Sequence, residues 1–471
     1  MRVWGLATAL LCGGVGCAHD EATRPPSEAS LPGVFAVEPG SQAGAVDVSR
    51  WWRSFGDPQL DALVEQALED NLDMVQSWAR LEQFARLAEQ QGSVQWPQIS
   101  ADLSASRRRA VGFDGAPAHA NAFAINGAAS YEVDLWGRLE ALDDAAQIDA
   151  MASREDLEAL AMTVAAQVAD TWFGVVEQRA QLDLLDAQIK TNAQFLELTE
   201  LRFAQGQTSA LDVYQQRQQV LATRAQRPLI QSRLSAQEHQ LAVLLGVPAG
   251  ALKTADRRTL PETSASPAAG LPSELLKRRP DLRSAQARAA SQDRRVAAAI
   301  ADRYPSIRLT ATTGLQADNL GDLIDQWVWS VASSLAMPLL DGGRRAAEVE
   351  RQKAALDERV GFLLKATLQA FREVQDALVA ERHQREFLAL NAEQLEVARV
   401  TLDEARRRYV QGLTDYLPVL STLQRVQQIE QSQLGARRQI VSLRIQLHRA
   451  LGGDWTAELS APARAQEESS P

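Results

Sequence analysis

The 471-residue sequence lacks most of the features that would indicate an enzyme, a nucleic-acid-binding protein or a helical membrane protein. Its two cysteines, Cys12 and Cys17, both lie at the N-terminus, so no disulfide or cysteine-based metal site is expected in the body of the chain. Its 60 acidic residues outnumber 49 basic residues, which argues against nucleic acid as a partner because binding to phosphates requires a basic face. No run of eighteen consecutive apolar residues follows residue 17. A membrane crossing by the rest of the chain would therefore require strands.

The chain also lacks a recognisable catalytic constellation. Its five histidines are scattered without the spacing of metal ligands, and neither a nucleophile elbow nor a phosphate-binding loop occurs. We therefore expect no enzymatic activity, no cofactor and no metal site.

The first residues have the pattern of a secretory signal. A positive start at Met1-Arg2 precedes an apolar stretch and small residues. Cys17 follows Val15-Gly16, an arrangement similar to a bacterial lipobox, although Gly14 stands where leucine is usual. We predict a signal peptide at residues 1–16 and acyl chains, including palmitate, on Cys17; a plain signal peptide is the alternative. Residues 17–50 are rich in Pro, Ala, Ser and Glu and are expected to form a lipid-anchored tether.

What the sequence does contain is an internal repeat. Asp73, Arg80, Pro97 and Ile99 recur 208 positions later, and Gly137, Arg202, Gly206 and Leu211 recur after 206 positions. Two copies of one unit in the same order indicate a tandem duplication. We predict a first structural repeat at residues 51–250, a linker at 251–271, a second repeat at 272–455 and a polar C-terminal tail at 456–471.

Each repeat contains alternating apolar and polar residues that predict a hairpin of two strands of about ten residues. The first hairpin is expected around Ile99 to Val133, with Arg107, Arg108 and Arg109 in its loop, and the second around Ile307 to Leu335. The basic loop could meet lipid phosphates, but a solvated loop is the preferred interpretation. Four strands are too few for one chain to close a barrel.

After each hairpin the chain is expected to be helical over an unusual length. Residues 139–203 and 344–409 contain no proline and a single glycine each, and about 65 helical residues would extend roughly 100 Å. Sevenfold apolar spacing predicts coiled-coil-like packing. Turns at Gly206 and Gly412 should begin return helices, the first capped by Thr208 or Ser209 and the second by Thr414 or Asp415.

Several motifs together resemble the TolC-like outer-membrane efflux proteins, and most closely their NodT-like lipoprotein branch. The motifs are, in chain order, WWRSFGD at 51–57, YEVDLWGR at 131–138, LKRRPD at 276–281, PLLDGGR at 338–344 and ALGGDW at 450–455. The resemblance implies a mainly α fold with a membrane β-barrel. Three chains with four strands each would form a trimeric 12-stranded barrel, continuous with a long periplasmic α-helical barrel.

The resemblance also implies a function and partners. The chain would be the outer-membrane channel of a tripartite efflux system, a passive exit duct for small molecules such as drugs. Its partners would be two further copies in a homotrimer, a periplasmic adaptor protein, an inner-membrane RND-type transporter and outer-membrane lipid. Asp212, Arg408 and Tyr409 match a periplasmic gate, and the tips at Gly206 and Gly412 match adaptor-docking sites. Thr414, Pro418 and Ser421 depart from the charged residues often found in relatives. The alternative is a non-conducting periplasmic coiled-coil or adaptor protein.

Overall fold

The computed structural model describes residues 48–111, 117–263 and 274–461. The predicted signal peptide, Cys17 and nearly all of the tether lie outside these residues, as do parts of the linker and tail. The described chain divides into two compact units. The first unit contains residues 80–111, 117–154 and 284–365, and the second contains residues 48–79, 155–263, 274–283 and 366–461.

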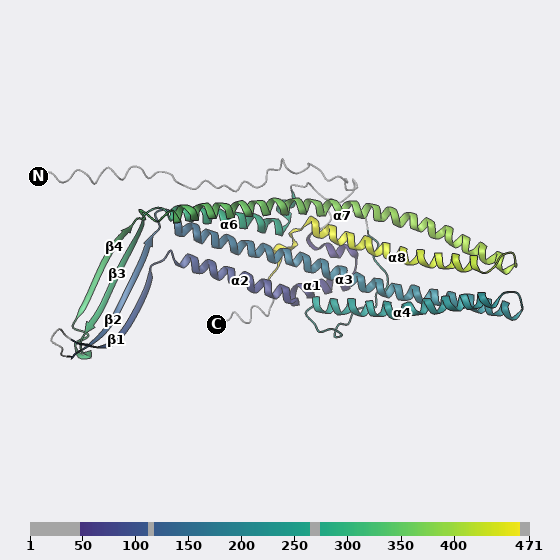
Figure 1. The fold of residues 1–471 in the computed structure, drawn as a ribbon, viewed down its shortest axis with the longest axis horizontal. Helices are drawn as coiled ribbons and strands as arrows, with labels where there is room; N and C mark the ends of the chain where they lie inside the picture. Colours follow the sequence, from purple (N-terminus) through teal and green to yellow (C-terminus); the bar gives the residue numbers. More distant parts are fainter. Residues whose placement is uncertain (1–47, 112–116, 264–273, 462–471) are drawn as a thin grey trace. The chain divides into compact units, whose positions relative to one another are not determined.

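The predicted duplication is confirmed by the order and length of the elements (Figure 1). In the first copy, α2 (Leu72–Ser93) precedes β1 (Gln98–Val111), β2 (Pro117–Val133), α3 (Arg138–Ala204) and α4 (Ala210–Leu244). In the second copy, α6 (Pro280–Ala301) precedes β3 (Ser306–Ala317), β4 (Trp327–Ala336), α7 (Arg344–Val410) and α8 (Leu417–Leu451). The corresponding helices have equal lengths of 22, 67 and 35 residues. The described fold is mainly helical, as predicted.

The first unit contains one antiparallel sheet in the order β1, β2, β3, β4 (Figure 1). Pairing continues from β1 to β4, with Leu103 opposite Ile125, Ile125 opposite Leu315 and Leu315 opposite Trp327. Strands β1 and β2 have 14 and 17 residues, so both are longer than the ten predicted. The expected loop position of Arg107 to Arg109 is wrong, because β1 continues through them to Val111.

Alternation gives this sheet one apolar face. Side chains on that face remain exposed in the single chain, at 82% for Ile99, 78% for Leu103 and 72% for Val331. The opposite face carries small and polar residues, including Ser100, Ser104, Asn126, Ser130, Thr310, Thr312, Ser330 and Ser334. An exposed apolar face on a sheet of this size indicates contact with lipid or with another protein surface.

The second unit is built around an apolar core in which α3 is central. Trp51 and Trp52 of the 3-10 helix η2 (Val48–Phe55) are each 1% exposed and pack among apolar residues of α1 (Pro58–Asp70), α3, α4 and α8. An 18-residue stretch of α3 is apolar enough to cross a membrane by length and composition, but 72% of it is buried inside the protein, as in a core helix. No other helix in the described ranges contains such a stretch.

In this unit, side chains at two breaks between helices bind the C-terminal ends of the return helices α4 and α8. Helices α1 and α2 are separated at Asn71, whose amide donates to the carbonyl of Leu244 at 2.8 Å. Arg279, 208 positions later, likewise donates to the carbonyl of Ala450 at 3.2 Å. The chain approaches closely here, since a Cβ on Gly452 would lie 2.6 Å from the Arg278 carbonyl oxygen. The two copies of the repeat therefore share equivalent contacts at the breaks between helices.

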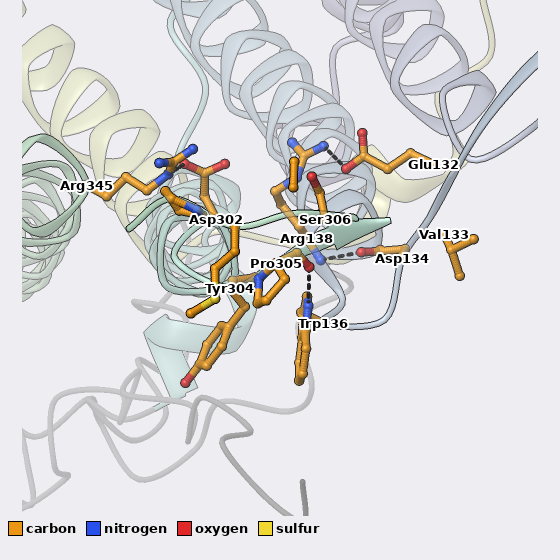
Figure 2. A pocket seen from close by; sticks show the side chains of 14 residues that line it. Glu132, Val133, Asp134, Trp136, Arg138, Asp302, Tyr304, Pro305, Ser306 and Arg345 are labelled. Carbon is orange, nitrogen blue, oxygen red and sulfur yellow. Dashed lines mark hydrogen bonds and ion pairs between the residues drawn. The ribbon is translucent and has the colours of Figure 1, made fainter. Parts of the chain in front are cut away.

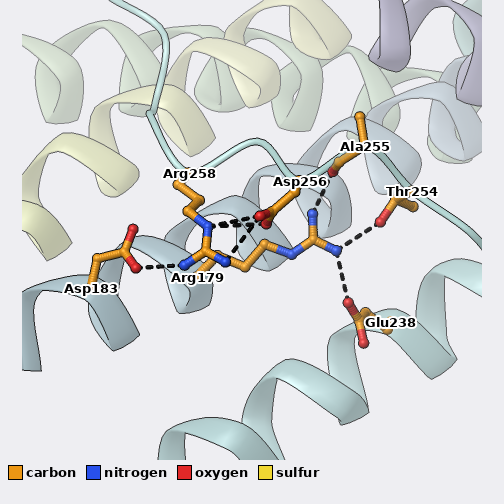
Figure 3. Close-up of polar contacts among 7 residues, drawn as sticks. All are labelled: Arg179, Asp183, Glu238, Thr254, Ala255, Asp256 and Arg258. Carbon is orange, nitrogen blue, oxygen red and sulfur yellow. Dashed lines mark hydrogen bonds and ion pairs between the residues drawn. The ribbon is translucent and has the colours of Figure 1, made fainter. Parts of the chain in front are cut away.

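The segment that follows α4 lies against α3 in the second unit and is held there by polar contacts (Figure 3). Arg179 of α3 donates to the carbonyl of Ala255 at 2.6 Å, to Thr254 at 2.7 Å and to Glu238 at 2.9 Å. Arg258 pairs with Asp183 of α3 at 2.5 Å. These contacts hold residues 254–258 against α3 and α4.

His448 of α8 is buried in the same unit and stacks on the ring of Trp51, with centroids 5.4 Å apart and planes 13° from parallel. Burial, together with the nearby Arg444 guanidinium, lowers the pKa of His448 from 6.5 to about 4. The imidazole is therefore neutral at physiological pH.

Candidate functional site

The predicted site lies in the second unit, where α3 meets α4 and α7 meets α8. Gly206 and Gly412 end the two long helices with φ angles of +71° and +74°, a conformation that favours glycine. Gln207 N–H donates to the Arg202 carbonyl and Leu413 N–H donates to the Arg408 carbonyl, both at 2.9 Å. This is the Schellman arrangement, in which a glycine turn satisfies the last carbonyls of a helix. We call residues 202–212 the first tip and residues 408–416 the second tip.

The first tip is stabilised by a capping box. Ser209 is the N-cap of α4 and accepts from the N–H of Asp212 at 3.3 Å, while the Asp212 carboxylate accepts from the N–H of Ser209 at 3.1 Å. The hydroxyl of Thr208 also donates to the Asp212 carboxylate. Ser209 thus caps the helix as predicted, and Asp212 is half-buried in this cap. A reciprocal cap of this kind stabilises a helix start.

The second tip has a different start. The N-cap of α8 is Tyr416, which makes no side-chain capping bond. The predicted caps Thr414 and Asp415 are therefore wrong, and the hydroxyl of Thr414 is buried without a hydrogen-bond partner among the described residues. Pro418 in the first turn lacks an N–H and so lowers the number of donors that need a cap. The two tips have equivalent turns but unequal caps.

Tyr409 joins the second tip to the first. Its side chain is 3% exposed, and its hydroxyl donates to Oγ1 of Thr208 at 3.2 Å. Because Thr208 donates in turn to Asp212, a hydrogen-bonded chain runs from α7 to the cap of α4. Arg202 reinforces this contact, with its guanidinium carbon 4.7 Å from the Tyr409 ring centroid and Nη1 3.0 Å from the Val410 carbonyl oxygen.

A second tyrosine, which sequence reasoning missed, makes a parallel contact. Tyr416 is fully buried, and its hydroxyl donates to Oε1 of Gln216 in α4 at 2.8 Å. Its ring packs on Tyr409 with centroids 5.2 Å apart. Burial raises the pKa of Tyr416 well above its ordinary value, so the phenol stays protonated and can donate. An aromatic residue four positions after Gly412 was the available signal.

Arg408 is not part of this hydrogen-bonded chain. Its side chain is 59% exposed and its Nε pairs with Glu404, one turn earlier in α7, at 2.9 Å. The Arg408 contact lowers the pKa of Glu404, although both groups face solvent. The structure thus connects two of the three predicted gate residues, Asp212 and Tyr409, and leaves Arg408 outside this chain, exposed and paired with Glu404.

Next to the tips, α3, α4 and α8 enclose a row of neutral polar side chains. Asn192 is fully buried; its amide donates to Thr223 at 2.8 Å and its carbonyl oxygen accepts from Gln427 at 2.9 Å. Gln216 donates to the Asn192 carbonyl at 2.7 Å, and Gln188 donates to the Gln427 carbonyl at 3.2 Å. We call these five residues the amide seam. Such a row is unusual because coiled-coil interiors are normally apolar.

A separate pocket lies in the first unit, where strands pass into helices (Figure 2). The indole N–H of Trp136 donates to the Pro305 carbonyl at 2.7 Å, and its ring stacks on Tyr304 with centroids 4.9 Å apart. The pocket's charged groups are paired, Arg138 with Glu132 at 2.6 Å and Arg345 with Asp302 at 2.8 Å. These contacts fix the ends of the strands rather than leave reactive groups exposed.

Within the described ranges, no group of three or more His, Cys, Asp or Glu side chains could hold a metal ion. The lipidation of Cys17 lies outside the described residues and stays a prediction.

Comparison with known proteins agrees with this architecture. Residues 63–247 and 271–453 match the family described as outer membrane efflux protein. The chain is 30% identical to the pyoverdine export outer membrane protein OpmQ of Pseudomonas putida, over 93% of this chain and 94% of that protein. It is 29% identical to the toluene efflux pump outer membrane protein TtgF of the same species, over 88% of each chain. The solved outer-membrane channel OprN superposes with a TM-score of 0.82 at 26% identity, covering 90% of this chain and 99% of that one.

The chain therefore belongs to the outer membrane efflux protein family. It is an outer-membrane channel component of an efflux system, with a helical extension into the periplasm.

Proposed function

We propose that the chain works as a passive exit duct formed by three copies. The observation that carries this proposal is the four-stranded sheet, which has one exposed apolar face and two outer edges, β1 and β4, without a paired strand among the described residues. In lipid, every backbone donor and acceptor needs a partner, so an open sheet cannot be stable alone. Pairing of β4 with β1 of the next copy would remove all edges and close twelve strands around a channel.

Mass measurement in mild detergent tests the assembly, and planar-bilayer recording tests conduction. We expect three chains per particle and discrete single-channel currents. A stable monomer in lipid would overturn the trimer, and a trimer that never conducts would favour the non-conducting structural protein.

We assign the periplasmic gate to Asp212, Arg408 and Tyr409. The contact from Tyr409 through Thr208 to Asp212 supports this assignment, because it ties the second hairpin to the first within one chain. Separating the two hairpins would break it. The exposed guanidinium of Arg408 is suited to a contact with a neighbouring copy, since threefold symmetry would repeat it around the axis.

The remaining partners follow from the same architecture. The tips at Gly206 and Gly412 would dock a periplasmic adaptor, which connects the duct to an inner-membrane RND-type transporter. That transporter would supply the energy, so the duct itself catalyses no reaction. Two relatives from the same family are named for the export of different compounds, pyoverdine and toluene. Because similar channels carry such different names, we infer that the transporter selects the cargo. Cross-linking from a cysteine introduced next to Gly412 should capture the adaptor; capture of the transporter alone would contradict this order.

At the N-terminus, we propose removal of residues 1–16 and acylation of Cys17, followed by the tether and the two repeats at 51–250 and 272–455. Two or more acyl chains on one residue give stable anchoring. The intact mass of the mature chain decides the matter, because an unmodified Cys17 or a different cleavage position is incompatible with it. Cys17→Ser should abolish the anchor and still allow the barrel to form.

A further inference from the structure

The strand register separates the three consecutive arginines of β1. Arg107 and Arg109 lie on the apolar face of the sheet, in line with Ile99 and Leu103, whereas Arg108 lies on the polar face. All three side chains are exposed. A cation on a lipid-facing surface requires an explanation, because at the bilayer midplane it is strongly destabilising.

The length of the strand places the two arginines at the edge of the membrane. Arg107 and Arg109 follow Ile99, the first apolar residue of this face, by eight and ten residues. At about 3.3 Å per residue and a tilt of about 40°, they stand roughly 20 and 25 Å above Ile99 along the membrane normal. The apolar band of such barrels is about 25 Å tall. The guanidinium groups thus reach the level of lipid headgroups.

An aromatic residue lies just below the arginines on the same face. Ala105, the last residue below Arg107 on this face, is paired with Phe123, and Trp327 and Trp329 of β4 occupy the two same-face rows below that level. The two tryptophans are 65% and 66% exposed. Large aromatic side chains concentrate at membrane interfaces, and Phe123 is the one that lies directly below the arginines on this face.

The chemistry around the arginines is that of an anion site. Arg107 is paired with Asn121 and Arg109 with His119 across the strands, so four groups that can donate hydrogen bonds share one face. That face of β1 and β2 contains no acidic residue. Within the described part of the chain, neither guanidinium has an ion pair or a hydrogen bond to a side chain. Arginine binds phosphate oxygens through two parallel hydrogen bonds, which makes it well suited to this ligand.

This end of the sheet is the end remote from α3 and α7, because β2 and β4 lead into those helices at their other ends. Since the helices extend into the periplasm, the arginines face the outer leaflet. We propose that Arg107, Arg109, Asn121 and His119 bind the phosphate groups of the phosphorylated glycolipid, lipid A, that forms the outer leaflet of the outer membrane. The site would anchor the barrel at a fixed height and bind a lipid, not the exported cargo.

Binding of the full-length protein in mild detergent to lipid A tests this site, with bisphosphorylated and dephosphorylated forms of equal acyl composition. Arg107→Gln with Arg109→Gln should weaken binding of the bisphosphorylated form about tenfold, which corresponds to about 1.4 kcal/mol. The dephosphorylated form should bind parent and variant alike. Arg108→Gln is the matched control, since it removes the intervening charge from the opposite face, and should stay within about twofold of the parent.

Three outcomes would overturn the proposal. One is equal loss in Arg108→Gln, which would indicate a general charge effect. Another is unchanged affinity of the double variant for the bisphosphorylated lipid. The third is dissociation of the assembly in the double variant without a change in lipid affinity, which would assign the arginines to contacts with acidic residues of a neighbouring copy. If the double variant does not fold, Arg107→Lys with Arg109→Lys retains the two charges. Its affinity for the bisphosphorylated lipid should lie between the parent's affinities for the bisphosphorylated and for the dephosphorylated lipid. Full parental affinity for both lipids would refute phosphate recognition.

Discussion

Tyr409→Phe should open the resting channel, because it removes one hydroxyl and leaves the ring in place. The ring is 3% exposed, lies under Arg202 and packs on Tyr416, so the variant keeps these contacts and should fold. Only the hydrogen bond to Thr208 is lost. A neutral hydrogen bond contributes about 0.5–1.5 kcal/mol. If three copies open together, the closed state loses about 1.5–4.5 kcal/mol, which raises the open-to-closed ratio by a factor of about 10 to about 2,000.

Asp212→Ala is a less informative substitution at the same site. It would remove the contact with Thr208 but also the capping box of α4, whose loss costs about 0.5–2 kcal/mol by itself. A change in conductance could then reflect a frayed helix. Combined with Arg408→Ala it should raise conductance further, provided that Arg408 contacts a neighbouring copy.

Single-channel recording of purified protein in a planar bilayer measures the resting open probability. Tyr214→Phe is the matched control, because this tyrosine is 65% exposed on α4 and its hydroxyl lies outside the contact between the hairpins. The control should behave like the parent. Equal resting currents in Tyr409→Phe and the parent, with unchanged thermal stability, would show that the bond to Thr208 is structural and that the gate lies elsewhere.

Three further predictions test other parts of the structure. Gly412→Ala should lower the free energy of unfolding by about 1–2 kcal/mol, because Gly412 has a positive φ. Gly452→Ala, with a similar φ and an added clash with a carbonyl oxygen, should lower it by at least about 2 kcal/mol more, as measured by urea unfolding. Equal losses in the two variants would contradict the close approach at Gly452. Burial keeps His448 neutral in the folded protein, whereas the unfolded chain takes up a proton there below pH 6.5. The free energy of unfolding should therefore fall by about 3 kcal/mol from pH 6.5 to pH 4. His448→Phe should flatten this dependence in thermal unfolding measured across that pH range. Leu103→Arg, near the middle of the apolar face, should make folding into lipid vesicles less favourable by about 2–4 kcal/mol. The neighbouring Ser104→Arg, on the opposite face, should cost clearly less; the reverse order would invert the assignment of faces.

Much of the fold was predictable from patterns that extend over long stretches of the sequence. The 206-residue offset between Gly206 and Gly412 located both turns, and the absence of proline from residues 139–203 and 344–409 predicted the long helices. The alternation in both hairpins predicted all four strands. These features depend on residue types that restrict the backbone locally, so a sequence can display them directly.

The features that the sequence did not predict depend on contacts between residues that are far apart in the sequence or on neighbouring strands. Asn71 caps the start of α2 by accepting from the N–H groups of Asp73 and Met74, but no local pattern specifies the contact of its amide with the distant Leu244 carbonyl. The three arginines of β1 suggested a loop by their charge, but cross-strand pairing overrides composition at the end of a long strand. The bond from Tyr409 to Thr208 joins residues 201 positions apart, and nothing in the local sequence specifies that partner.

The amide seam has a consequence for movement between the helices. An apolar seam favours one register, because shape complementarity is lost when knobs leave their holes. Amide side chains of Asn192, Gln216 and Gln427 both donate and accept hydrogen bonds, so after a shift of one helix they can form new bonds with different partners. Such an exchange of partners would reduce the penalty for unsatisfied buried donors and acceptors during the shift. We infer that α8 can change its position against α3 and α4 at low cost in free energy. Asn192→Leu with Gln427→Leu should accordingly raise the melting temperature while lowering the maximal open probability; a stable variant that opens as fully as the parent would exclude this role.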